Sequence, residues 1–224
     1  MSDFDWMQLL NPEFYITMSL GGVKVGLWIV LFIVFAETGL FAGFFLPGDS
    51  LLFVTGVLSA SLMSGVIPDD QIVLKLIALI FLISISGIAG NIFGYWFGKK
   101  GGKKLYTRED SLLFKKQHLI NATIFYEKHG ALTIFIARFI PFIRTFAPIV
   151  AGTVDMDYKK FISYNISGSF VWSASFILAG HYLNGYLLAK YNYNIGEHLG
   201  YIVLFIVLVT TIPFITKMLF SLKK

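Results

Sequence analysis

Cysteine is absent from the 224 residues, and charged residues make up only 14% of them. The missing cysteine excludes a disulfide framework, thiolate chemistry and cysteine metal sites. The four histidines, at positions 118, 129, 181 and 198, show no clustered spacing, so we expect no metal and no cofactor. Soluble domains hold about 25% charged residues, whereas here 56% are hydrophobic and several apolar runs reach the ~20 residues of a spanning helix. The chain is therefore predicted to be an all-α polytopic membrane protein.

The net charge of +5 comes from basic residues that gather in short segments between the apolar runs. Seven of them lie within residues 99–116, which the positive-inside rule places in the cytoplasm. This distribution accounts for the positive net charge, so we expect no nucleic acid as a partner. The first twenty residues carry three acids and no Lys or Arg, which is not the pattern of a cleaved signal peptide.

We expect an interfacial segment over residues 1–22 and a single membrane domain over 23–224. The first half of this domain covers about 23–98, and a basic cytoplasmic loop with an amphipathic helix covers 99–130. The second half covers about 131–189, and a last helix over 198–219 leaves the C-terminus in the cytoplasm. Within the two halves, 72–98 and 161–189 are the predicted crossing helices. Lys75, near the start of the first of them, is expected to extend toward the membrane surface.

Two apolar stretches are interrupted by proline at membrane depth. The first reads FAETGLFAGFFLPGDSLLFVT over 35–55 and breaks at Pro47 and Gly48. The second, over 135–152, carries Pro141 and Pro148 as its expected breaks. Proline removes a backbone donor and disfavours helix at the preceding residue. Because both flanks of 131–151 are assigned to the cytoplasm, this segment is predicted to be a re-entrant hairpin.

Short matches relate the two halves. The tetrapeptide SISG at 84–87 resembles NISG at 165–168, and TG at 55–56 resembles AG at 151–152. The first crossing helix runs inward and the second outward, so the halves have opposite topology. The sequence thus predicts an inverted repeat of two opposed re-entrant helical hairpins, each followed by a transmembrane helix, plus a C-terminal transmembrane helix.

The same two stretches carry four charges: Glu37 and Asp49 in the first, Arg138 and Arg144 in the second. An unpaired charge at membrane depth costs roughly 2.5 to 3.5 kcal/mol, so we expect the acids to pair with the arginines across a hydrated cavity. The acids are then candidate proton sites. Two simpler roles stay open: Asp49 as a helix N-cap, and arginines that bridge carbonyls freed by the prolines.

These motifs together resemble the DedA membrane protein family, within the VTT-domain superfamily. The resemblance rests on an acid followed by LPGD at 46–49, on GYWFG at 94–98, on RFIPFIR at 138–144 and on AG at 151–152, with Asn165 and Trp172 further along. It implies two opposed re-entrant hairpins, each followed by a crossing helix. It also implies that Glu37 and Asp49 are essential membrane acids, that Arg138 and Arg144 are essential arginines, and that Asn165 and Trp172 support them.

The resemblance implies a lipid translocase that uses the proton motive force to flip undecaprenyl phosphate, or a related phospholipid, across the bacterial plasma membrane. Its partners would be the polyprenyl phosphate or phospholipid substrate, membrane lipids and protons. The arginines would bind the phosphate bidentately while an acid takes up the proton. The alternative is a proton-coupled antiporter for small cations or drugs, in which the acids bind the substrate. No nucleophile and base stand together, so no enzyme is predicted.

Overall fold

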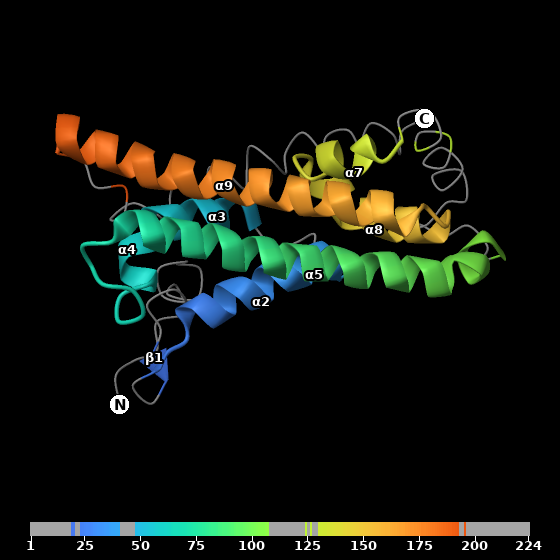
Figure 1. The fold of residues 1–224 in the computed structure, drawn as a ribbon, viewed down its shortest axis with the longest axis horizontal. Coiled ribbons are helices and arrows are strands. Elements are labelled where there is room, and N and C mark those ends of the chain that lie inside the picture. Colours follow the sequence, from blue (N-terminus) through green and yellow to red (C-terminus); the bar gives the residue numbers. More distant parts are fainter. Residues whose placement is uncertain are drawn as a thin grey trace, which may run out of the picture. The chain divides into compact units, whose positions relative to one another are not determined.

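The computed structural model describes residues 19–20, 23–40, 48–107, 124, 126, 130–192 and 195. Within them, the two-residue strands β1 (Ser19–Leu20) and β2 (Val23–Lys24) pair antiparallel. The helices, labelled in Figure 1, are α2 (Gly26–Gly39), α3 (Gly48–Val57), α4 (Ser59–Leu62), α5 (Ile72–Thr107), α7 (Leu132–Ala137), α8 (Pro141–Thr153) and α9 (Tyr158–Tyr191). Apart from the short β1–β2 pair, the elements of the described residues are helices, as predicted for an all-α protein. Most of the predicted segment 1–22, most of the amphipathic helix within 99–130 and the last helix over 198–219 lie outside them.

Two described helices are long and apolar enough to cross a membrane. They cover Ile72–Gly101 and Tyr158–Tyr191, with mean hydropathies of 2.6 and 1.2 in their most apolar stretches. Only 33% and 39% of those stretches are buried inside the protein, whereas the core helix of a soluble protein would be mostly buried. Exposed apolar side chains such as Ile77 and Phe81 are therefore suited to contact lipid. These helices match the two predicted crossing helices.

Contacts divide the chain into two compact units. The first comprises Met1–Val30, Pro47–Ile80 and Ala174–Lys224, and the second comprises Leu31–Leu46 and Phe81–Ser173. The first unit contains α3, α4, the start of α5 and the C-terminal part of α9. The second contains the end of α2, most of α5, α7, α8 and the N-terminal part of α9.

In the first unit, α3 packs backbone to backbone against α9. A Cβ atom on Gly56 would overlap the carbonyl oxygen of Ile177, and one on Gly180 would overlap that of Phe53. Glycine on both helices allows this close approach, which is a common way for helices to associate in membranes.

Lys75 is fully buried in the first unit, which was not expected of a side chain predicted to extend toward the membrane surface. Its ammonium group donates to the carbonyl oxygen of Ala60 at 3.1 Å and pairs with Asp69. Nearby in the fold, Ser59 shares a hydrogen bond of 3.2 Å with His181. These contacts tie the short helix α4 to α5 and α9, and they compensate a cation that burial would otherwise penalise.

In the second unit, α8 packs against α5 through the same kind of close backbone contact at glycines. A Cβ atom on Gly152 would overlap the carbonyl oxygen of Tyr95, and one on Gly98 would overlap that of Ile149. In both units the contacting residues stand three positions apart on each helix. This spacing places them on one face of each helix.

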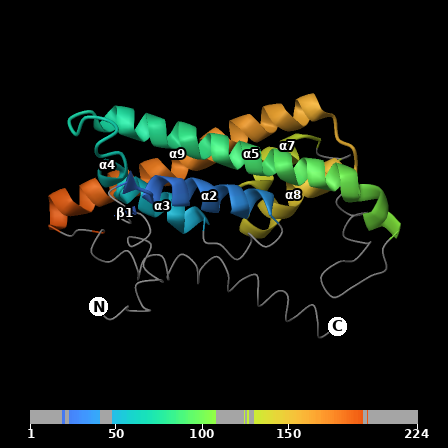
Figure 2. The ribbon, with the colours of Figure 1, turned by 90° about the horizontal axis from the view of Figure 1, so that it is seen from below.

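Within the second unit, α2 and α9 also lie along α5 (Figures 1 and 2). Ser86 donates to the carbonyl oxygen of Leu31 at 2.6 Å, which joins α5 to α2. The hydroxyl groups of Ser84 and Ser173 lie 2.7 Å apart, which joins α5 to α9. Buried hydroxyls thus find partners on neighbouring helices, as polar groups must in a lipid environment.

The first helix ends earlier than its apolar run. The first stretch is predicted to break at Pro47 and Gly48; α2 ends ahead of this point, at Gly39, and α3 begins at Gly48. The end coincides with a close approach to α5, because a Cβ atom on Gly39 would overlap the backbone of Gly90. Hydrophobicity does not report this backbone contact, so the sequence alone gives no sign that α2 ends at Gly39.

The second interrupted stretch breaks ahead of Pro141 only. Ile140 is extended, with φ −114° and ψ 107°, since helical geometry is disfavoured just before proline. A further break was expected at Pro148, but α8 continues through it to Thr153. Pro148 packs against Gly94, where a Cβ atom would lie 3.4 Å from the proline Cβ. Packing against a neighbouring helix lets a membrane helix tolerate the lost hydrogen bond.

The close contact of Gly152 with α5 predicts that alanine at this position destabilises the protein, whereas alanine usually stabilises a helix relative to glycine. Alanine normally stabilises a helix by about 0.5 to 1 kcal/mol over glycine. Gly152→Ala should instead lower the stability by about 1 to 3 kcal/mol, because the new methyl group must separate α8 from α5. Denaturant unfolding in micelles measures this, with Gly185→Ala as the control, since Gly185 faces open space. Equal effects of the two variants would contradict the packing described.

Candidate functional site

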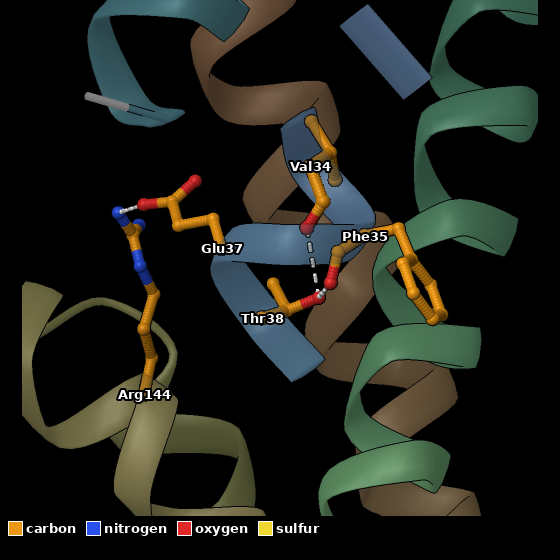
Figure 3. A network of polar contacts seen from close by, with 5 residues as sticks. All are labelled: Val34, Phe35, Glu37, Thr38 and Arg144. Carbon is orange, nitrogen blue, oxygen red and sulfur yellow. Dashed lines mark hydrogen bonds and ion pairs between the residues drawn. The ribbon is translucent and has the colours of Figure 1, made fainter. Parts of the chain in front are cut away.

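Glu37 and Arg144 form a buried ion pair in the second unit. Glu37 stands in the last turn of α2 and Arg144 in the first turn of α8, with exposed fractions of 1% and 5%. Nη2 of Arg144 donates to Oε1 of Glu37 (Figure 3). The pairing that the sequence predicts between an acid of the first stretch and an arginine of the second is thus present.

The neighbours of Glu37 on α2 fix the direction of its side chain. The hydroxyl group of Thr38 donates to the carbonyl oxygen of Val34 at 2.9 Å, and the Phe35 ring lies 6.1 Å from that of Phe93 on α5. Figure 3 shows Phe35 turned toward α5 and Glu37 turned toward Arg144. The packing of α2 on α5 therefore presents the carboxylate to α8.

Arg138 is the second buried arginine, and it follows directly after α7. Its side chain is 2% exposed, and Nη1 donates to Oδ1 of Asn165 at 3.0 Å. Nε and Nη2 have no hydrogen-bond partner among the described residues. Gly87 on α5 leaves room for Nη2, because a Cβ atom there would overlap it. Buried guanidinium donors without an acceptor are costly, so this group is suited to bind an anion.

Asn165 connects Arg138 to a residue that sequence reasoning missed. Its Nδ2 donates to the carbonyl oxygen of Ile88 at 3.2 Å, which leaves Oδ1 to accept from Arg138 and from Nδ2 of Asn91 at 2.8 Å. Asn91 is 4% exposed. The sequence did contain a sign of this contact. An asparagine inside a long apolar helix is energetically unfavourable in lipid and usually hydrogen-bonds to a polar partner.

Trp172 supports both arginines from α9. The guanidinium carbon atoms of Arg138 and Arg144 each lie 5.2 Å from the centre of its ring, and the indole is fully buried. The face of an aromatic ring attracts cations. One side chain thus stabilises two like charges in the same small space. The supporting roles expected of Asn165 and Trp172 remain proposals, but both residues contact the arginines.

A small pocket lies between these groups, lined by Thr38, Asn91, Ile134, Arg138, Arg144, Ala147 and Pro148. It is too narrow to admit a water molecule in this structure. Among the described residues, the buried charges of the second unit are one carboxylate and two guanidiniums, Glu37, Arg138 and Arg144, which sum to +1. The described buried charges around the pocket therefore carry an excess of one positive charge.

Asp49 is the fourth charge that the sequence singles out. It belongs to the first unit and stands in the first turn of α3, where it is partly exposed. An acid at this position interacts favourably with the helix dipole. The described site thus contains three of the four predicted charges. The choice between a proton site and an N-cap for Asp49 stays open.

The VTT domain model matches residues 46–182, a stretch that includes both arginines, Asn91, Asn165 and Trp172. Protein DedA of Escherichia coli strain K12 is 41% identical over 162 residues, which cover 71% of this chain and 70% of that protein. The chain belongs to the DedA family. A second DedA-family relative, membrane protein Rv0364 of Mycobacterium tuberculosis strain H37Rv, is 36% identical over 184 residues, covering 82% of this chain and 74% of that protein. With its apolar helices, this chain is a membrane protein.

Another relative carries a functional name. Undecaprenyl phosphate transporter A of Bacillus subtilis strain 168 is 35% identical over 97 residues, which cover 43% of this chain and 49% of that protein. That name describes transport and not catalysis, in agreement with the prediction that this DedA-family chain is not an enzyme. No solved structure matches the chain.

The buried pair predicts a large loss of stability when one partner is neutralised. Glu37→Gln should lower the free energy of unfolding by about 3 to 5 kcal/mol, because Arg144 stays buried without its counter-charge. The matched control is Asp155→Asn, which removes the exposed pair of Asp155 with Lys99 at 2.7 Å and should change the stability far less, because water screens exposed pairs. Denaturant unfolding in micelles compares the two. A loss for Glu37→Gln as small as the control's would contradict the ion pair.

Proposed function

We propose that this protein is a membrane lipid translocase that moves undecaprenyl phosphate, or a related phospholipid, across the bacterial plasma membrane with the help of the proton motive force. The observation that carries the proposal is Arg138. It is buried at the pocket, and two of its nitrogens have no hydrogen-bond partner among the described residues. A phosphate offers oxygen acceptors whose spacing suits the guanidinium fork.

The ion pair beside Arg138 supplies a route for proton coupling. When a phosphate enters, Arg144 can exchange the Glu37 carboxylate for a phosphate oxygen. Glu37 would then be buried without a counter-charge, and uptake of a proton removes that penalty. Because the pocket admits no water in this structure, α2 and α8 must move apart for the head group to enter. Binding of phosphate and uptake of a proton would thus occur together.

The rival function, an antiporter for small cations or drugs, receives less support from this site. The described buried charges around the pocket sum to +1, and Glu37 is already engaged with Arg144. A cationic substrate would be repelled by two guanidiniums, whereas an anionic phosphate is attracted. The rival would need a different acid, such as Asp49.

The glycine contacts support the inverted repeat and its re-entrant hairpins, α2 with α3 and α7 with α8. Phe53 and Gly56 of α3 stand 96 positions before Ile149 and Gly152 of α8. Their partners on α5 and α9 are related by an offset of 82: Tyr95 to Ile177, and Gly98 to Gly180. Each hairpin helix would therefore pack on the crossing helix of the other half.

We further propose a cytoplasmic C-terminus, because the chain ends in two lysines.

Reconstitution in liposomes tests the function. The wild-type protein should flip a polyprenyl phosphate faster than protein-free vesicles do, and an imposed pH gradient should increase the rate. Arg138→Lys should lower the rate by about tenfold or more, because lysine keeps the charge but loses the fork. Lys190→Arg, at an exposed position on α9, is the control. No flipping above protein-free vesicles would contradict the proposal, and cation-dependent proton efflux from the same vesicles would favour the rival.

Gly87 provides a test that separates function from stability. An alanine there overlaps the movable end of Arg138 and makes ordinary contact with Val34, so the fold should stay about as stable as the wild type. The displaced guanidinium should lower the flipping rate by about ten- to a hundredfold. Flipping and denaturant unfolding are measured together, again with Gly185→Ala as the control. A normal flipping rate in a stable Gly87→Ala protein would argue against a role for Arg138 in binding.

A further inference from the structure

Hydrogen bonds fix which way the Asn91 amide faces. Nδ2 of Asn165 donates to the carbonyl oxygen of Ile88, so Oδ1 of Asn165 must be the atom that accepts from Arg138. The same oxygen accepts from Asn91, so Asn91 must use its Nδ2 group. Its own Oδ1 is then left over, buried and without a hydrogen-bond partner among the described residues. Asn91 lines the pocket together with both arginines.

A buried carbonyl oxygen of this kind accepts a hydrogen bond and cannot donate one. The two guanidiniums beside it can only donate. A ligand that satisfies the whole pocket must therefore present anionic acceptors and one hydrogen-bond donor within a few ångströms. A singly protonated phosphate monoester combines both on one phosphorus atom. The phosphate group of a phosphodiester, and that of the fully ionised monoester, offers acceptors only, so the donor would have to come from another part of the head group.

The charge balance allows the same species. With Glu37 ionised, Glu37, Arg138 and Arg144 sum to +1, and a monoanion leaves the buried group neutral. With Glu37 protonated the sum is +2, and a dianion does so, so the net charge alone does not select one form of the monoester. A lipid whose donor is an ammonium group would bring a third cation next to the two guanidiniums. The donor requirement therefore selects the protonated monoester.

We propose that Asn91 is a specificity-determining residue that makes the site select lipid phosphate monoesters in their singly protonated form. Oδ1 of Asn91 would accept the hydrogen bond of the P–OH group while Arg138 and Arg144 bind the other oxygens. This inference rests on the proposed function, because it concerns the head group that the same pocket binds. It extends that function by excluding phosphodiester lipids as good substrates.

The test compares two polyprenyl lipids of the same chain length in the same vesicles at pH 6. One is the phosphate monoester, about half of which carries its proton at this pH. The other is the fluorophosphate, in which fluorine replaces the P–OH group, so the single negative charge stays and the donor is lost. The readout is the ratio of the two flipping rates. Because both rates come from one preparation, the ratio does not depend on how much protein is folded.

Wild-type protein should flip the monoester about tenfold faster than the fluorophosphate, as expected for one buried hydrogen bond to a charged group. Asn91→Leu should bring the ratio close to one, mainly by slowing the monoester. The control Ser84→Ala removes another buried hydrogen bond between α5 and α9, away from the pocket, and should keep the wild-type ratio.

Two results would overturn the inference and leave the proposed function intact. One is equal flipping of both lipids by the wild type, and the other is an unchanged ratio in Asn91→Leu, which would show a merely structural role. If the wild type flips neither lipid above protein-free vesicles, the proposed function fails, and the inference fails with it.

Discussion

The second unit depends on one interaction, the buried ion pair between Glu37 and Arg144. It joins the last turn of α2 to the first turn of α8, two elements more than a hundred residues apart in sequence. Neither charge is tolerable alone at this burial. Arg138 adds a second positive charge that no described carboxylate neutralises, and Trp172 holds both guanidiniums against its ring. The resulting excess of one charge among the described residues is the reason we propose an anionic ligand.

The backbone contacts explain how these charges are kept in place. Two crossings, α3 on α9 and α8 on α5, bring carbonyl groups so close that only glycine fits. Such contacts leave little freedom for the helices to slide, and they position the start of α8 where Arg144 projects toward α2. A third glycine, Gly87, makes room for Arg138. Small residues thus serve two purposes, close packing of helices and space for a charged side chain.

Part of this arrangement could be predicted from the sequence. The burial cost of charge made Glu37, Arg138 and Arg144 recognisable, and apolar length gave the two crossing helices. Contacts between distant elements could not be read in this way. The early end of α2 at Gly39, the burial of Lys75 and the continuation of α8 through Pro148 all depend on neighbours that packing supplies. Asn91 was overlooked because an amide carries no charge, although its burial in an apolar helix is the same kind of signal.

The central claim is that the arginines bind the lipid phosphate directly. The chain has three arginines, so ¹⁵N-arginine labelling of an Arg108→Lys protein leaves signals from Arg138 and Arg144 alone. Solid-state NMR of proteoliposomes with a polyprenyl phosphate can then detect dipolar coupling between ³¹P and the guanidinium ¹⁵N nuclei. We predict a coupling that weakens when Arg138 is also replaced by lysine and disappears when Arg144 is replaced as well. Active proteoliposomes that show no such coupling would contradict the account.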